Sequence, residues 1–239
     1  EIISQLDDVS NLKTSSPSPS DFYDAYNQLF EEGYENIICI PLSKELSSTY
    51  QSAVIAKTYF DDKEDNIFVV DTNLANFGIA NLIETLLPLF EKKDLDFAYL
   101  KEETLKRVAN STVEFSVMDL NHLVHGGRLS KVAGVIGQVL HIKPIVKMIK
   151  GKLEVIKKER VIAKVFDEFE ETIKSFTSKF KHVQVKIVDL MQDNVAVKLV
   201  DRIKEKFKGI KISRVRTVRP TFYIHLGNCG IGISVSAYN

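Results

Sequence analysis

The sequence predicts an α/β protein with two lobes. Short buried strands alternate with helices over the first half of the chain, which is typical of a parallel sheet with flanking helices. After Lys143-Pro144 the pattern changes to a β-hairpin followed by long amphipathic helices, which indicates a second α/β lobe with a mixed or antiparallel sheet. We therefore expect an N-terminal lobe over residues 1–142 and a C-terminal lobe over residues 143–239.

The N-terminal lobe begins with a clear helix signal. Ser18 is suited to cap a helix, Pro19 fits its first turn, Asp21 completes a capping box, and Gly33 provides a stop. The elements expected next are a strand over 36–41, a helix over 49–59, a strand over 67–70, helices over 75–92 and 103–109, a strand over 113–117 and an apolar helix over 132–139.

The C-terminal lobe is expected to open with a hairpin. Its strands, 145–149 and 153–157, flank Lys150-Gly151-Lys152. Amphipathic periodicity predicts two long helices, over 161–180 and 194–207. Further strands are expected over 183–188, 210–218, 221–225 and 231–235. This assignment places His225 at the end of a strand.

Composition excludes several classes of function. Of 239 residues, 44% are hydrophobic and 27% are charged, and 32 basic residues balance 32 acidic ones. A chain with a net charge of +0 has no overall field to hold nucleic acid or an anionic membrane surface. Its apolar stretches are far shorter than the ~20 residues that a membrane-spanning helix needs. Two cysteines and a polar first segment without signal-peptide features favour the cytoplasm.

Familiar catalytic motifs are missing from the sequence. It contains no phosphate loop, dinucleotide fingerprint, zinc-protease motif or nucleophile elbow. The spacing of His122 and His125 is only a weak signal for a metal site, and a role as surface or turn residues accounts for them better. We therefore expect neither a metal nor a cofactor. Asp71 and Asp119 have no spacing that links them as an acid/base pair, and Asp71 fits a turn. Cys39 is expected in the core.

Hydroxyl side chains cluster before two predicted helices. One cluster is Thr14-Ser15-Ser16, and the other runs from Ser43 to Thr49. In open α/β sheets, ligands bind beyond the carboxyl ends of strands, where helix N-termini favour an anionic group. Serine and threonine also cap helices. Spacing alone therefore leaves open whether these hydroxyls cap helices or bind an anion.

Two further motifs combine glycine with a polar side chain. In Gly126-Gly127-Arg128, a permissive backbone precedes a guanidinium that can make a forked contact with a carboxylate or phosphate. In His225-Leu226-Gly227, a histidine precedes a glycine turn. The alternatives are a turn that carries a surface arginine and a hydrogen-bonded core histidine.

Taken in order, these motifs resemble the DegV family of bacterial fatty-acid-binding proteins. Each motif alone is common, but six in the right order are specific, and they cover nearly the whole chain. They are Thr14-Ser15-Ser16-Pro17-Ser18-Pro19, Leu46-Ser47-Ser48-Thr49-Tyr50, Val70-Asp71-Thr72 with Gly78, Gly126-Gly127-Arg128-Leu129-Ser130, Ile142-Lys143-Pro144 and His225-Leu226-Gly227.

The resemblance implies a carrier rather than an enzyme. A long-chain fatty acid would lie between or within the two lobes. A separate ATP-dependent fatty acid kinase would phosphorylate its carboxylate, and the acyl phosphate would serve phospholipid synthesis. Matching the family's motifs residue by residue, we expect Thr14, Ser47 and His225 to bind the carboxylate. Arg128 matches the family's arginine after two glycines, and its setting after Gly126 and Gly127 leads us to expect that it contacts the phosphate or the partner kinase.

The sequence departs from the family pattern in places. Ser16 and Ser48 replace a glutamine and a glycine, and Asn228-Cys229 replaces a proline and a glycine in the terminal loop. The family's first strand normally lies well before the threonine motif, whereas 13 residues precede Thr14 here, so we expect the N-terminal lobe to lack that strand. Candidates for lining the ligand pocket are Phe77, Ile79, Val135, Ile136 and Val139.

Two other functions remain open from the sequence. The lobe architecture resembles part of the dihydroxyacetone kinases, so a small-molecule kinase or phosphotransferase component is the alternative, although it would need a nucleotide site. The other possibility is a protein that serves only as an interaction partner or scaffold. A stoichiometric bound fatty acid would support the carrier, and ATP hydrolysis by an empty protein would support the kinase component.

Overall fold

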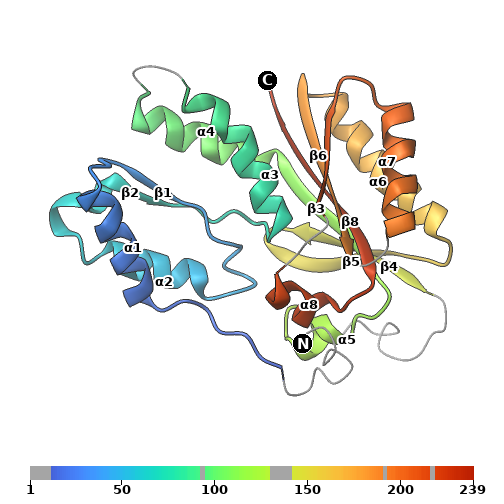
Figure 1. Cartoon of the computed structure of the whole chain (residues 1–239), viewed down its shortest axis with the longest axis horizontal. Coiled ribbons are helices and arrows are strands. Elements are labelled where there is room, and N and C mark those ends of the chain that lie inside the picture. The colour runs from blue at the N-terminus through green and yellow to red at the C-terminus, as the bar shows by residue number, and fades with distance from the viewer. Residues whose placement is uncertain (1–11, 92–94, 130–141, 191–192, 216–218) are drawn as a thin grey trace.

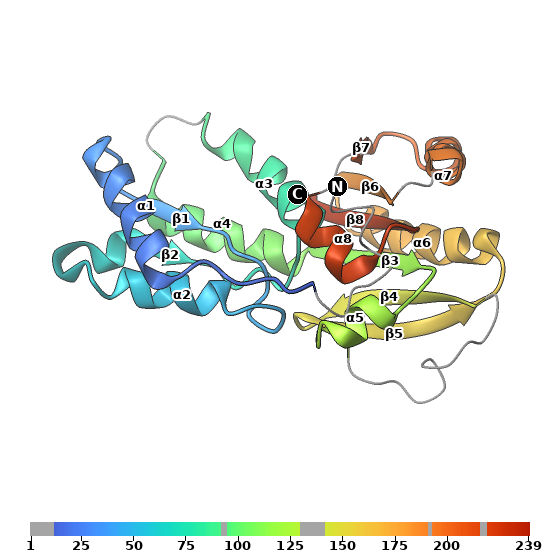
Figure 2. The same ribbon diagram turned by 60° about the horizontal axis from the view of Figure 1, so that its bottom comes forward.

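The computed structural model describes residues 12–91, 95–129, 142–190, 193–215 and 219–239. Over these residues the chain forms a small lobe around a two-stranded parallel sheet and a larger lobe around a six-stranded mixed sheet (Figure 1). Turning the view brings the bottom of Figure 1 forward, so that helices α5 (Asn121–His125) and α8 (Pro220–Leu226) lie in front of the larger sheet, with the small lobe beside them (Figure 2). The predicted two-lobe α/β class is confirmed.

The small lobe is built on β1 (Ile37–Cys39) and β2 (Ile67–Val69), which pair in parallel. Helices α1 (Pro19–Glu31) and α2 (Thr49–Lys57) accompany them, and the 3-10 helix η3 (Asp61–Asn66) leads into β2. The capping box of α1 is confirmed, because the Asp21 N–H donates to the Ser18 hydroxyl and the Ser18 N–H donates to the Asp21 carboxylate. Tyr26, Ile37, Ala56 and Ile67 form the core of this lobe.

The larger sheet has the strand order β5-β4-β3-β8-β6-β7. Of its pairs, β6 with β7 is parallel and the others are antiparallel. The predicted hairpin is confirmed as β4 and β5. The strands are β3 (Ser111–Val117), β4 (Lys143–Ile149), β5 (Lys152–Glu159), β6 (His182–Leu190), β7 (Lys211–Val215) and β8 (Gly230–Tyr238).

Strand β3 lies on the other side of the predicted lobe boundary from its partners. It precedes residue 142 in sequence, yet it pairs with β4 on one edge and β8 on the other. The strand is buried on both faces, so its backbone groups need partners on both edges. Those partners come from residues 143–149 and 230–238, and the two sheets therefore divide the chain between β2 and β3.

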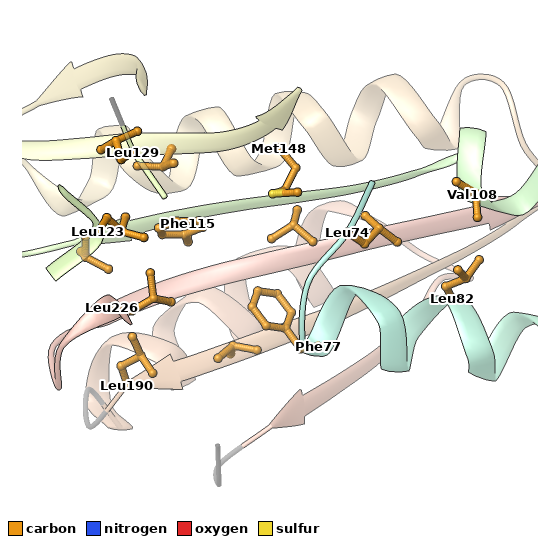
Figure 3. Close-up of a cluster of buried hydrophobic side chains, with 14 of the residues drawn as sticks. Leu74, Phe77, Leu82, Val108, Phe115, Leu123, Leu129, Met148, Leu190 and Leu226 are labelled. Atoms are coloured by element: carbon orange, nitrogen blue, oxygen red, sulfur yellow. The ribbon is translucent and has the colours of Figure 1, made fainter. Parts of the chain in front are cut away.

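The two faces of the larger sheet have different coverings. Helices α6 (Ile162–Thr177) and α7 (Asp193–Lys206) pack on one face over a core that includes Phe169, Val185 and Ile233. The other face carries the apolar cluster drawn in Figure 3, to which α3 (Phe77–Leu86) contributes Phe77 and Leu82. Side chains alternate along β3, so Phe115 joins this second cluster, whereas the carboxylate of Glu114 reaches α6.

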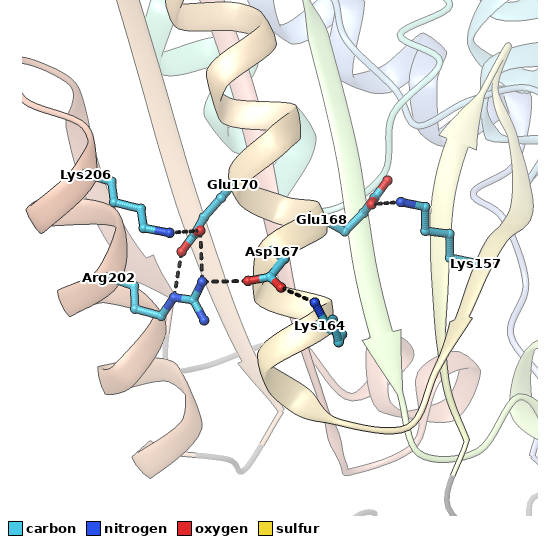
Figure 4. A network of polar contacts seen from close by, with 7 residues as sticks. All are labelled: Lys157, Lys164, Asp167, Glu168, Glu170, Arg202 and Lys206. Atoms are coloured by element: carbon cyan, nitrogen blue, oxygen red, sulfur yellow. Dashed lines mark hydrogen bonds and ion pairs between the residues drawn. The ribbon is translucent and has the colours of Figure 1, made fainter.

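Ion pairs fasten the outer helices to each other and to the sheet (Figure 4). The Glu170 carboxylate of α6 accepts hydrogen bonds from Arg202 and Lys206 of α7. Lys157 of β5 pairs with Glu168 on the same helix α6. Burial raises the pKa of Glu170, but the hydrogen bonds and charges of its two partners outweigh burial and hold the pKa below its ordinary value.

Several predicted elements differ in type or in length, and the helix predicted over 103–109 begins earlier, at Phe97. Residues 221–225 were predicted as a strand but form helix α8 (Pro220–Leu226), where Pro220 fits the first turn and Tyr223 and Leu226 share a buried face. Helix α3 ends at Leu86, earlier than predicted, because Pro88 cannot donate a backbone hydrogen bond, and the 3-10 helix η4 (Leu87–Leu89) follows. The remaining helices are α4 (Phe97–Ala109) and α5 (Asn121–His125). The predicted helix 132–139 lies outside the described residues.

Candidate functional site

A cavity of about 830 Å³ lies where the small lobe meets the second face of the larger sheet. Its wall includes the loop after β1, the first turn of α3, strands β3 to β5 and helix α8. Most of this wall is apolar, and a cavity of this character is suited to an apolar ligand. Its apolar side chains are Pro17, Pro41, Leu42, Leu46, Ala75, Phe77, Ile79, Val113, Phe115, Leu123, Met148, Leu153, Phe222 and Leu226.

Polar side chains from four segments that are distant in sequence meet at this cavity. The Thr14 hydroxyl lies 2.9 Å from His225 Nε2, across 211 positions of sequence. The Arg128 Nε donates to the carbonyl of Leu46 at 3.0 Å, which brings the guanidinium beside the loop that carries Ser47. Thr14, Ser47, Arg128 and His225 therefore border one cavity.

The protonation of His225 follows from its surroundings. Burial lowers the pKa of His225, and the nearby Arg128 and His122 lower it further, which favours the neutral ring. Its Nδ1 is buried and has no hydrogen-bond partner among the described residues. Because an orphaned buried N–H is rarer than an underused acceptor, the proton belongs on Nε2. Nε2–H then donates to Thr14, whose own O–H can donate to a ligand.

The two glycines before Arg128 have different roles. A Cβ at Gly126 would lie 2.8 Å from His225 Nδ1 and 3.1 Å from the carbonyl oxygen of His122. The φ of Gly126 is an ordinary −67°, so it is the close approach of the His225 ring that requires glycine. Gly127 has open space around it but a φ of +70°, a conformation that favours glycine.

The hydroxyls of the loop before α2 form local bonds. The N–H of Thr49 donates to the Ser47 hydroxyl at 3.2 Å, and the two hydroxyls lie 2.8 Å apart. Ser47 thus supports the start of α2 while it borders the cavity. Ser48 holds the capping position of α2 without a side-chain cap, and its hydroxyl lies 2.6 Å from that of Ser16. Two of the residues that depart from the family pattern, Ser16 and Ser48, therefore contact each other.

The apolar lining only partly matches the candidates drawn from the sequence. Phe77 and Ile79 border the cavity, whereas Val135, Ile136 and Val139 lie outside the described residues. Phe115 and Met148, which were not among the candidates, border the cavity from β3 and β4. Their strand periodicity was visible, but a strand has two faces, and only the tertiary structure shows which face meets the cavity.

The other polar residues singled out from the sequence have structural contacts. Asp71 accepts hydrogen bonds from the backbone N–H groups of Lys44 and Asn73, which agrees with a turn-organising role. Asp119 accepts the N–H of Asn121 at 2.8 Å. Within the described residues, no three of the His, Cys, Asp and Glu side chains are grouped so that they could hold a metal ion.

The terminal loop keeps a left-handed turn despite its departure from the family pattern. Gly227 has a φ of +75° and caps the end of α8, two residues after His225. The carbonyl of Cys229 then accepts the N–H of Met118 at 3.1 Å. None of the helices described here is long and apolar enough to cross a membrane.

The family model of the uncharacterised DegV proteins matches residues 1–237, and the chain belongs to the DegV family. A DegV domain-containing protein of Staphylococcus aureus (strain COL) is 29% identical over 239 residues, which are 98% of this chain and 82% of the relative. A DegV domain-containing protein of Halalkalibacterium halodurans is 30% identical over 222 residues, which are 92% of this chain and 77% of the relative.

Solved structures of similar fold carry fatty acids. The Streptococcus pneumoniae Fatty Acid Kinase (Fak) B3 protein, loaded with linoleic acid, matches with a TM-score of 0.83 and 24% identity, covering 100% of this chain and 84% of that one. A DegV family protein from Eubacterium eligens, loaded with heptadecanoic acid, matches with a TM-score of 0.82 and 20% identity, covering 100% and 86%. At these identities the comparison shows a shared fold.

Proposed function

We propose that this chain is a carrier that binds a long-chain fatty acid in the 830 Å³ cavity and presents the carboxylate to a partner fatty acid kinase. The observation that carries the proposal is the Thr14–His225 hydrogen bond at the edge of an apolar cavity. The fatty acids in solved structures of this fold support it. Because the kinase would consume ATP, we place the phosphorylation of the bound fatty acid in the cytoplasm.

The apolar wall supplies most of the proposed binding energy. A tail of about fifteen methylenes at ~0.8 kcal/mol each contributes roughly 12 kcal/mol before the costs of ordering the ligand. A carboxylate that enters an apolar cavity needs hydrogen-bond donors, because an unpaired charge there is costly. The Thr14 hydroxyl, with its oxygen engaged by His225, and the Ser47 hydroxyl are the donors we assign.

Arg128 is assigned to the phosphate rather than to the fatty acid. Its Nε and Nη1 are engaged by the carbonyls of Leu46 and Gly126, so the guanidinium is held beside the head group. A phosphoryl group that forms on the carboxylate adds negative charge within reach of this cation. Gly126 and Gly127 shape the turn that holds Arg128 in place.

Mass spectrometry tests fatty-acid binding. The purified protein is expected to show a mass difference in the fatty-acid range between native and denatured samples, and added fatty acid should raise its melting temperature. At 100 times the dissociation constant, a ligand stabilises by about 2.7 kcal/mol. An empty protein that no fatty acid stabilises would contradict the proposal, and ATP hydrolysis by that protein would favour the kinase-component alternative.

Two sets of variants separate binding from phosphorylation. Thr14→Ala/Ser47→Ala should weaken fatty-acid binding at least tenfold, because a hydrogen bond to a charged group contributes roughly 1.5–3 kcal/mol. Arg128→Ala should retain the fatty acid within a few-fold but lose tenfold or more of acyl phosphate formation by the kinase. Arg128→Lys should recover little, because an ammonium lacks the forked geometry. If Arg128→Ala lost its fatty acid, Arg128 would instead be assigned to binding the carboxylate.

A further inference from the structure

Helix α8 carries His225 but is too short to hold itself in place. It spans seven residues, Pro220–Leu226, and isolated helices of this length are not stable in water. The position of the His225 ring therefore depends on what α8 packs against. One neighbour is α5, which is also short. It is capped by Gly126, the glycine that lies against the His225 ring.

His122 of α5 joins the two helices next to His225. Its Nδ1 lies 3.3 Å from the carbonyl oxygen of Ile224, and since a carbonyl only accepts, Nδ1 carries the proton and donates it. The other edge of the ring lies against Gly227, where a Cβ would come within 3.1 Å of His122 Nε2. His122 thus contacts the residue before His225 and the second residue after it.

From these contacts we propose that His122 positions His225, holding the last turn of α8 so that Nε2 of His225 reaches the Thr14 hydroxyl. This inference rests on the proposed function for its consequence in fatty-acid binding, but the contact itself exists without ligand. Within the part of the chain that the structure describes, the charged and titratable groups near the His225 ring are Arg128, His122 and, around a second cavity of about 290 Å³ that His225 also borders, Lys13 and His125.

His125 provides a matched control from the same helix. It is exposed, and its Nδ1 lies 2.9 Å from the carbonyl oxygen of Asn121 in its own helix, so it makes no such bond to α8. The test compares His122→Leu, which removes the donor, with His122→Asn, whose side-chain amide places a donor near the position of Nδ1. His125→Leu removes a histidine without touching the α5–α8 hydrogen bond.

The first measurement uses the full chain without ligand. Ring nitrogen spectra of His225 are expected to report a proton on Nε2 in the parent, in His122→Asn and in His125→Leu. In His122→Leu the His225 signals should shift and its titration should move, because the ring loses both the contact that positions it and a neighbouring imidazole whose charge lowers the pKa of His225. His225 spectra and titration that are identical in parent and His122→Leu would overturn the inference.

The second measurement is the affinity for oleate per folded molecule, with the folded fraction measured by circular dichroism. We expect at least fivefold weaker binding for His122→Leu, near-parental binding for His122→Asn, and unchanged binding for His125→Leu. Equal losses in both leucine variants would also overturn the inference. A parent that binds no oleate would refute the proposed function alone, because the ligand-free His225 spectra still decide the role of His122.

Discussion

Replacing Gly126 by alanine places a methyl group against the ring that the proposed site depends on. The added Cβ would lie 2.8 Å from His225 Nδ1, closer than real Cβ contacts come, and 3.1 Å from the His122 carbonyl. The carbonyl belongs to the helix backbone and cannot yield easily, so the His225 ring must move. A displaced ring no longer supports the Thr14 hydroxyl, which lies 2.9 Å from Nε2.

The magnitude follows from the bonds that are lost. The neutral Thr14–His225 bond contributes about 0.5–1.5 kcal/mol, and a hydrogen bond from Thr14 to a carboxylate about 1.5–3 kcal/mol. If the complex of the variant lacks the bond from Thr14 to the carboxylate, fatty-acid affinity falls by on the order of 10- to 100-fold. The free energy of unfolding of the ligand-free protein should fall by only about 1 kcal/mol, because the φ of Gly126 suits alanine.

The neighbouring Gly127→Ala is the matched comparison. Nothing lies within 4 Å of the added Cβ, but the φ of +70° costs an L-residue about 1–2 kcal/mol. We therefore expect Gly127→Ala to lower the free energy of unfolding while oleate affinity per folded molecule stays near the parental value. Calorimetric titration with oleate and urea unfolding of the same samples measure both quantities. Parental oleate affinity in Gly126→Ala would refute the reasoning about His225.

Two further predictions concern stability. Since the folded-state pKa of Glu170 lies below its ordinary 4.5, its ion pairs with α7 stabilise the fold above pH 4.5, and this stability should be lost as the pH falls below that value. Urea unfolding of Glu170→Gln should show a flatter fall over the same range, and superimposable pH profiles would contradict this. Gly151→Ala should destabilise more than Gly209→Ala in thermal unfolding, because both have positive φ but only Gly151 would also overlap Ser43. Equal melting temperatures would count against a tight contact between the hairpin turn and the loop after β1.

Local signals in the sequence were sufficient for much of the fold. The capping box at Ser18, the hairpin around Gly151 and the periodicity of α6 and α7 each depend on residues within a few positions of one another. Such patterns predict local structure directly, because a helix cap or a tight turn needs no partner that is distant in sequence. The ordered motifs also indicated the family, because each motif is a local pattern of residues.

Long-range contacts decided the rest. Residues 221–225 have the β-branched and aromatic side chains of a strand, but Pro220 and the packing of α8 on α5 make them a helix. Strand β3 belongs to the larger sheet because it pairs with β4 and β8, and both of these strands come later in the chain.

The candidate site shows the same division. The residues with suitable chemistry were evident from the sequence: a threonine, a serine, an arginine after two glycines and a histidine before one. The contact between Thr14 and His225 depends on the fold, because the two lie 211 positions apart and no local pattern records it. Only the tertiary structure showed that Gly126 makes room for the ring, since steric fit is a property of packed neighbours rather than of sequence spacing.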